Sequence, residues 1–92
     1  MMGREIQHID ILSHFKRQYK NLPIEIQKIA DEATQIFKNN PHDSRLRTHK
    51  LTNFKSYWAF SVTNKIRIIF EFGNNKNVFF YSIGSHDDYK KI

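Results

Sequence analysis

The sequence predicts an α+β fold in which two N-terminal helices pack on one face of an antiparallel β-sheet. Between residues 26 and 37 apolar side chains recur at helical spacing. From residue 57 onward the chain changes to short runs rich in β-branched and aromatic residues, separated by turn residues. We therefore expect a three-strand C-terminal meander, joined by one strand from the N-terminal end.

Length and composition fit a single globular domain over residues 1–92, with 39% hydrophobic and 26% charged residues. The 15 Lys and Arg against 9 Asp and Glu leave a net charge of +6. Such a charge favours polyanionic partners, although a solvated basic surface is the plain alternative. There is no cysteine, no apolar stretch long enough for a membrane span and no signal-peptide pattern. These features predict a cytoplasmic protein without a membrane partner.

The N-terminal half divides into one strand and two helices. Glu5–Leu12 carries alternating isoleucines and predicts the first strand. Ser13 is placed to cap a helix over residues 14–21, and Pro23 suits the first position of a second helix. The run Asn39-Asn40-Pro41 predicts its end. The apolar stripe of this second helix is expected to form core and consists of Ile26, Ile29, Ala30, Ala33, Ile36 and Phe37.

The C-terminal half predicts three strands, at residues 57–62, 65–72 and 77–84, with turns between them. If Thr63-Asn64 forms a two-residue tip, Phe60 pairs with Arg67 and Trp58 with Ile69, and paired residues share a face. The expected open face then comprises Trp58, Phe60, Lys65, Arg67, Ile69 and Glu71. The expected helix-covered face comprises Tyr57, Ala59, Ser61, Ile66, Ile68, Phe70 and Phe72. A one-residue bulge at the tip would exchange the two faces along one strand.

Arg67 is the sharpest candidate for a functional side chain. It interrupts an apolar strand of Ile and Phe residues, where a cation is unfavourable unless an anion meets it. Its planar guanidinium suits bidentate binding of a phosphate. The alternative is a structural ion pair with Glu71 or Asp87.

Two histidines are candidates for proton transfer, because imidazole titrates near neutral pH. His86 follows the last strand directly, and His49 lies in a basic segment between two leucines. For each, an ordinary surface or turn histidine is the alternative. The candidate RNA- and phosphate-binding residues around them are Arg47, Lys50, Lys55, Trp58 and Lys65. Further aromatic stacking surfaces are Tyr57, Phe79 and Tyr81, where they lie on the open face. The five histidines show no metal-ligand spacing, so we predict neither a metal site nor a cofactor.

Four segments together resemble one family. They are residues 46–51 (LRTHKL), 57–62 (YWAFSV), 66–71 (IRIIFE) and 83–88 (IGSHDD). The sequence resembles the RelE/ParE toxin superfamily, most closely its YafQ-like or plasmid-stabilisation branch, over nearly the whole chain. This resemblance implies a RelE-like fold and the toxin of a type II toxin–antitoxin system. It further implies a metal-independent endoribonuclease (an mRNA interferase) that cuts mRNA in the ribosomal A site and is neutralised by an acidic antitoxin.

The resemblance also assigns roles to single residues. Arg67 matches the family's phosphate-binding strand arginine, and His86 matches the histidine of its His-Asp-Glu-Val-Tyr ending. His49 matches the histidine of its His-x-Leu segment. Asp87 and Tyr89 are accessory candidates, but the family's tyrosine stands four residues after the histidine, one place beyond Tyr89. Two alternatives stay open, a ParE-like inhibitor of DNA gyrase and a catalytically inactive relative that only binds its antitoxin.

Overall fold

The computed structural model describes residues 6–52 and 56–85. Its elements in chain order are β1 (His8–Ile11), α1 (Ser13–Lys20), α2 (Ile24–Asn39), a short 3-10 helix (Ser44–Leu46), β2 (His49–Lys50), β3 (Tyr57–Ser61), β4 (Ile66–Phe72) and β5 (Asn77–Ser85). None of the helices in these ranges has the length and apolar character that a membrane span requires.

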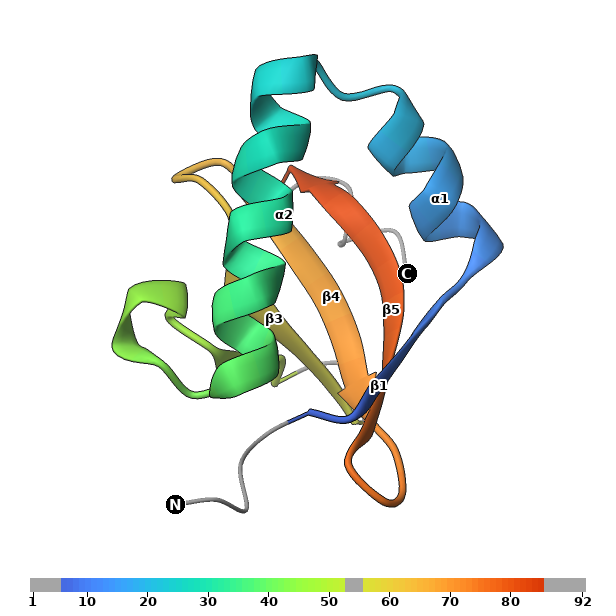
Figure 1. Cartoon of the computed structure of the whole chain (residues 1–92), viewed down its shortest axis with the longest axis vertical. Coiled ribbons are helices and arrows are strands. Elements are labelled where there is room, and N and C mark those ends of the chain that lie inside the picture. Colours follow the sequence, from blue (N-terminus) through green and yellow to red (C-terminus); the bar gives the residue numbers. More distant parts are fainter. Residues whose placement is uncertain (1–5, 53–55, 86–92) are drawn as a thin grey trace.

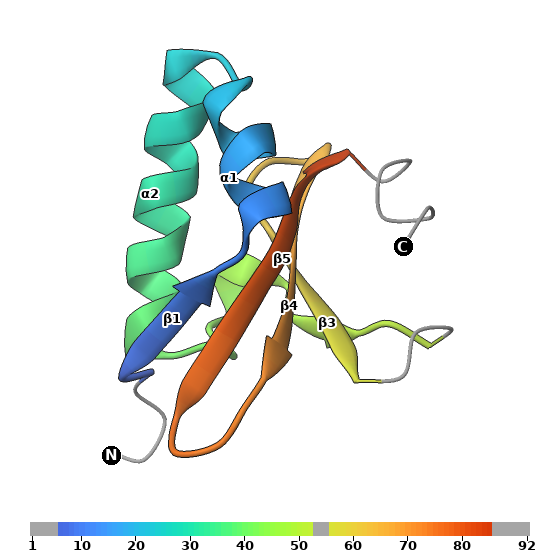
Figure 2. The ribbon, with the colours of Figure 1, turned by 90° about the vertical axis from the view of Figure 1, so that its right-hand side faces the viewer.

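The helices α1 and α2 cover the same face of the sheet, and neither α-helix of the described residues lies on the other face (Figures 1 and 2). The strand order is β1-β5-β4-β3-β2. The meander β3-β4-β5 is antiparallel, as predicted, and β1 joins its edge by parallel pairing with β5. The predicted α+β architecture is therefore confirmed. The sequence analysis missed the two-residue strand β2, which pairs with β3.

The main core lies between α2 and the sheet, and Phe37 is at its centre. Its side chain is fully buried, with ring centroids 4.6 Å from Phe60, 4.8 Å from Phe70 and 5.6 Å from Phe80. The helical stripe predicts this packing, because Ala30 and Ala33 are buried on the same side of α2 and let the helix approach the sheet closely. Ile29, at the margin of the stripe, is exposed.

The helix ends depart slightly from the prediction. Ser13 is the first residue of α1 rather than its cap, and Leu12 occupies the cap position in extended conformation without a side-chain bond. The predicted hydroxyl cap is therefore wrong, because the helix begins one residue earlier than predicted and Ser13 lies within it. Pro23 likewise precedes α2 as its cap. The predicted end of α2 at Asn39 is confirmed.

The register of the β3–β4 hairpin differs from the prediction by one residue. Phe60 pairs with Ile68 and Ser61 with Arg67. The backbone N–H groups of Val62 and Thr63 both donate to the Ile66 carbonyl, so the tip contains the extra residue Lys65. The predicted face of β4 is right, but the two faces of β3 are exchanged, as a bulged tip would require.

In consequence, Trp58 and Phe60 pack beneath the helices, and the open face of β3 carries Tyr57, Ala59 and Ser61. A second, smaller apolar cluster forms on this open face, where Leu51, Ala59 and Ile69 are buried together and Tyr57 packs against them.

Candidate functional site on the open face of the sheet

A braced loop leads into β2 and positions His49. The Asp43 carboxylate accepts hydrogen bonds from the backbone N–H and the guanidinium of Arg45, which lower the Asp43 pKa to about 2. The Thr48 hydroxyl donates to the Pro41 carbonyl. Arg47 adopts a left-handed conformation, with φ of 53°, that redirects the chain into β2. For a residue other than glycine this conformation is costly, so the loop must be held by its surroundings.

His49 stands on the open face, because it pairs with Ala59, which lies on that face. Its Nδ1 lies 2.9 Å from the Arg47 carbonyl oxygen. A carbonyl can only accept a hydrogen bond, so Nδ1 carries the proton. The neutral ring therefore keeps Nε2 as its proton-accepting nitrogen. The side chain is exposed, so Nε2 can meet a ligand from solvent.

Arg67 stands on the same face, paired with Ser61 across the hairpin. His49 lies on β2 and Arg67 on β4, with β3 between them, so their backbones are about 10 Å apart across the sheet. Along the strands, Arg67 is two residues from Ile69, which is level with His49, and this adds about 7 Å. The guanidinium Nη1 donates to the backbone carbonyls of Asn64, at 3.2 Å, and Thr63, at 3.5 Å. Within residues 6–52 and 56–85, no carboxylate forms an ion pair with Arg67. The alternative ion-pair partner Asp87 lies outside these ranges.

Glu71 was one of the two acidic residues considered as an alternative ion-pair partner of Arg67, and the structure places its carboxylate elsewhere. Glu71 Oε1 accepts from the Tyr81 hydroxyl at 2.8 Å, and Oε2 accepts from the Ser56 hydroxyl at 2.6 Å. The Tyr81 ring lies against Tyr57, with centroids 4.9 Å apart. Hydrogen bonding to Glu71, then burial, raise the Tyr81 pKa to about 12. The sequence analysis missed this cluster because the corrected register of β3 is what brings Tyr57 to Glu71.

The other predicted site residues are only partly brought together. Lys65 is exposed at the hairpin tip near Arg67, and Arg47 is exposed just before His49. Lys50 pairs with Trp58 on the helix-covered side, so neither shares a face with Arg67, and the prediction of Trp58 on the open face is wrong. The Trp58 ring instead contacts His42 and Phe72. The remaining predicted residues, Lys55, His86, Asp87 and Tyr89, lie outside the described residues.

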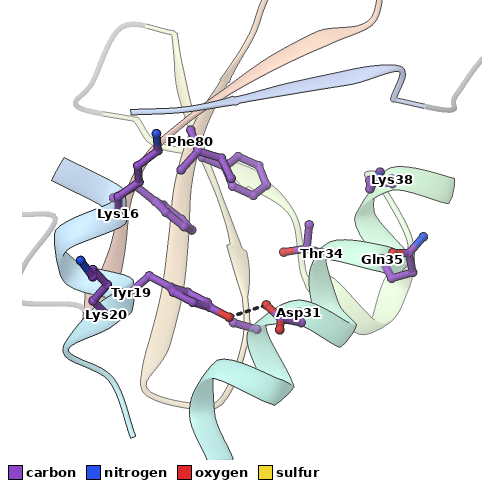
Figure 3. A pocket seen from close by; sticks show the side chains of 11 residues that line it. Lys16, Tyr19, Lys20, Asp31, Thr34, Gln35, Lys38 and Phe80 are labelled. Atoms are coloured by element: carbon purple, nitrogen blue, oxygen red, sulfur yellow. Dashed lines mark hydrogen bonds between the residues drawn. The ribbon is translucent and has the colours of Figure 1, made fainter. Parts of the chain in front are cut away.

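The described residues also form a groove on the opposite side of the molecule, between α1 and α2 (Figure 3). Its volume is about 500 Å³. Ile11, Phe15, Ala30 and Phe80 give it an apolar floor, and Lys16, Lys20 and Lys38 line its rim. The single acidic side chain among the lining residues, Asp31, accepts a 2.7 Å hydrogen bond from the Tyr19 hydroxyl across the groove.

The open face thus combines a proton acceptor at His49 with a planar cation at Arg67 that has no acidic partner among the described residues. A guanidinium of this kind suits a phosphate, and a neutral imidazole suits the removal of a hydroxyl proton. Within the two described ranges, no three His, Asp or Glu side chains gather closely enough to hold a metal ion.

The sequence matches no protein-family model and no curated protein. The structure, however, is similar to solved toxins. A YoeB/ParE toxin from Agrobacterium tumefaciens superposes with a TM-score of 0.74 at 12% identity, covering 87% of this chain and 99% of that chain. The RelBE2 toxin–antitoxin complex from Mycobacterium tuberculosis gives 0.71 at 13% identity, covering 94% and 95%.

The DinJ–YafQ toxin–antitoxin complex from E. coli gives a TM-score of 0.66 at 18% identity, covering 95% of this chain and 97% of that chain. At these identities the similarity concerns the fold. The chain therefore has the fold of the RelE/ParE toxin superfamily, and the resemblance seen in the sequence is confirmed at that level.

Proposed function

We propose that this protein is the toxin of a type II toxin–antitoxin system, acting as a metal-independent endonuclease on mRNA in the ribosomal A site. The observation that carries this proposal is the placement of His49 and Arg67 on one open face of a RelE-like sheet. Among residues 6–52 and 56–85, the hydrogen-bond partners of Arg67 are backbone carbonyls, and its other donors suit a phosphate. The net charge of +6 favours an RNA substrate.

In the proposed reaction, the 2′-hydroxyl of the RNA attacks the adjacent phosphorus. Nε2 of His49 takes the hydroxyl proton, since Nδ1 is occupied by the Arg47 carbonyl. Arg67 stabilises the charge that develops on the phosphate oxygens. The new bond joins the 2′-oxygen to phosphorus, and the bond from phosphorus to the 5′-oxygen breaks. An acid protonates the leaving oxygen, and His86 is the proposed donor by its position in the sequence motif.

A cell-free translation reaction tests ribosome dependence directly. A defined mRNA is incubated with the purified chain, with and without ribosomes, and new ends are mapped by primer extension in the presence of a metal chelator that leaves ribosomes intact. The proposal expects cuts at A-site codons only when ribosomes are present. Cleavage of naked RNA to the same extent would remove the ribosome from the mechanism, and intact mRNA under both conditions would contradict the nuclease assignment.

We further propose an acidic antitoxin as the protein partner, seated in the groove between α1 and α2. Support comes from charge and shape: the apolar floor suits the apolar side of an amphipathic segment, and the lysine rim suits its acidic residues (Figure 3). Several of the similar structures are complexes of a toxin with its antitoxin. Because the groove faces away from His49 and Arg67, this contact alone leaves the open face uncovered.

The partner proposal is tested by reversing two rim charges. Lys16→Glu with Lys20→Glu should weaken the complex with the co-transcribed neighbouring protein at least about tenfold, mainly through slower association. Lys28→Glu with Lys76→Glu is the matched control, because both lysines are exposed and lie outside the groove. Equal loss of affinity in both variants would show a general charge effect, and no loss in either would place the partner elsewhere.

A further inference from the structure

The open face carries an aromatic and acidic cluster at the end opposite the β3–β4 hairpin tip, and the proposed reaction does not use it. It consists of Tyr57, Tyr81, Glu71 and Ser56. Glu71 lies on the same face as Arg67 and four residues further along β4, which is about 13 Å. A single RNA strand whose phosphate is bound by Arg67 can therefore run along the open face. Its neighbouring nucleotides can then reach the cluster.

Two features of the cluster suit a nucleobase. The two tyrosine rings lie 4.9 Å apart with a 49° tilt and are only half-buried, so aromatic surface is left exposed on the open face. Every base has a flat face that stacks on such rings. Among the described residues, two hydroxyl groups donate to the adjacent Glu71 carboxylate, whereas a carboxylate offers about four acceptor positions. It therefore retains the capacity to accept from the amino group of a base.

We propose that Tyr57, Tyr81 and Glu71 form a nucleobase-reading site for a nucleotide that flanks the cleaved bond. The tyrosines supply stacking, and Glu71 selects bases with an exocyclic amino group, namely adenine, cytosine or guanine, over uracil, which offers one ring N–H only. The assignment of this nucleotide as flanking a cleaved bond rests on the proposed function. The base-reading site itself rests on the cluster.

A purely structural role is the competing explanation. The Ser56–Glu71 bond could simply brace the segment before β3, and the tyrosines could extend the small apolar cluster of Leu51, Ala59 and Ile69. The two explanations differ in their consequences. A brace affects the stability of the fold and treats all bases alike, whereas a reading site makes affinity depend on the base.

Hexanucleotides of 2′-O-methyl RNA test the site without cleavage, because their 2′-oxygen carries no proton. Fluorescence anisotropy is measured with adenine, cytosine, guanine and uracil hexamers. The wild-type chain should bind at least one amino-bearing hexamer more tightly than the uracil hexamer. Tyr81→Leu should lose about five- to a hundredfold in affinity for that hexamer. Tyr81→Phe, which keeps the ring, should retain most of it, and Glu71→Gln should reduce the preference over uracil.

His42→Leu is the control, because it removes an exposed aromatic ring from the helix-covered side. It should leave affinity and base preference unchanged, and thermal melting monitored by circular dichroism shows that each variant is folded. Where Tyr81→Leu is not folded, Tyr81→Phe and Glu71→Gln carry the test. If the wild-type chain binds none of the hexamers, or binds all four equally, the proposed base-reading site is wrong. The same follows from an unchanged preference in folded Glu71→Gln.

Mapping mRNA ends in cells separates this inference from the proposed function. If the wild-type chain cuts mRNA but folded Glu71→Gln leaves the base preference around the cuts unchanged, the reading site is wrong and the nuclease assignment stands. If the hexamers show the expected preference but mRNA stays intact, the nuclease assignment is wrong and the base-reading site stands.

Discussion

Among the described residues, Arg67 contacts the backbone carbonyls of its own hairpin rather than a carboxylate, which helps to accommodate a cation in an apolar strand. Arg67→Ala should reduce mRNA cleavage by about a hundred- to a thousandfold, since it removes the group that stabilises charge on the phosphate. Arg67→Lys should recover only part of the activity, because an ammonium group lacks the planar fork. Rates of cleavage in the cell-free reaction check both variants, and full activity of Arg67→Lys would show that charge alone suffices.

His49 has a defined tautomer because the Arg47 carbonyl accepts from Nδ1. His49→Ala should slow cleavage by about a hundred- to ten-thousandfold, the usual loss for a missing proton acceptor. Folding should be unaffected, since the side chain is exposed. His42→Ala, which also removes an exposed imidazole, is the control. If the His49→Ala protein cuts mRNA at the wild-type rate, His49 has no role in cleavage.

Tyr81 links the stability of the fold to pH. Its pKa rises from 10.0 to about 12 in the folded chain, chiefly through its bond to Glu71. The folded state therefore favours the neutral phenol, and the resulting stabilisation is complete below pH 10 and is lost as pH rises toward about 12. Tyr81→Phe should lack this part of the alkaline decline. Urea unfolding of both proteins across that range measures it, and parallel curves would contradict the contribution of Tyr81.

At the scale of single residues, the sequence identifies candidates by chemical type but not by face. Arg67 and His49 are recognisable because a cation within an apolar strand and a histidine among cations are unusual. Trp58 was assigned to the wrong face, since every side chain on a strand depends on its register. The Glu71–Tyr81 bond was not predictable, because it joins two strands and a β-bulge shifts their pairing between Ile69 and Phe70.

At the scale of elements, helical periodicity is the most informative signal. The stripe on α2 contains the buried Ala30, Ala33 and Phe37, because a sixteen-residue helix repeats the pattern several times. It is wrong for Ile29, which lies at the margin of the stripe and is exposed. The hairpin tip and β2 were less predictable. One residue at the tip changes the register of a whole strand, and β2 has only two residues, both exposed, so it has no pattern of its own.

The packing of α2 on the sheet gives a direct stability prediction. Phe37→Ala should lower the free energy of unfolding by about 3–5 kcal/mol, because a fully buried ring in contact with three other phenylalanines leaves a cavity. Ile24→Ala is the control on the same helix, since its side chain is 63% exposed, and its effect should stay within about 0.5 kcal/mol. Chemical denaturation of both variants measures the difference, and similar losses would contradict the assignment of the core.

At the scale of the molecule, the helix layer and the sheet layer present two different surfaces on opposite sides. The helix side carries the groove with its basic rim, and the open side carries His49, Arg67 and the tyrosine pair. The order of elements and the layer arrangement were predictable from periodicity, because alternation and helical spacing differ clearly in this chain. The groove was not predictable, since it depends on how α1 and α2 lie relative to each other on one face of the sheet (Figure 1).

The proposed function requires that the open face cuts mRNA during translation. Induced expression in bacteria, with pulse labelling of protein and DNA synthesis and mapping of mRNA ends, measures this in the cell. We predict a rapid fall in protein synthesis with new mRNA ends inside coding regions, and much weaker effects from Arg67→Ala at equal expression. Blocked DNA synthesis with intact mRNA would contradict the claim in favour of gyrase inhibition. Harmless expression of the folded wild-type chain would contradict it in favour of an inactive, antitoxin-binding relative.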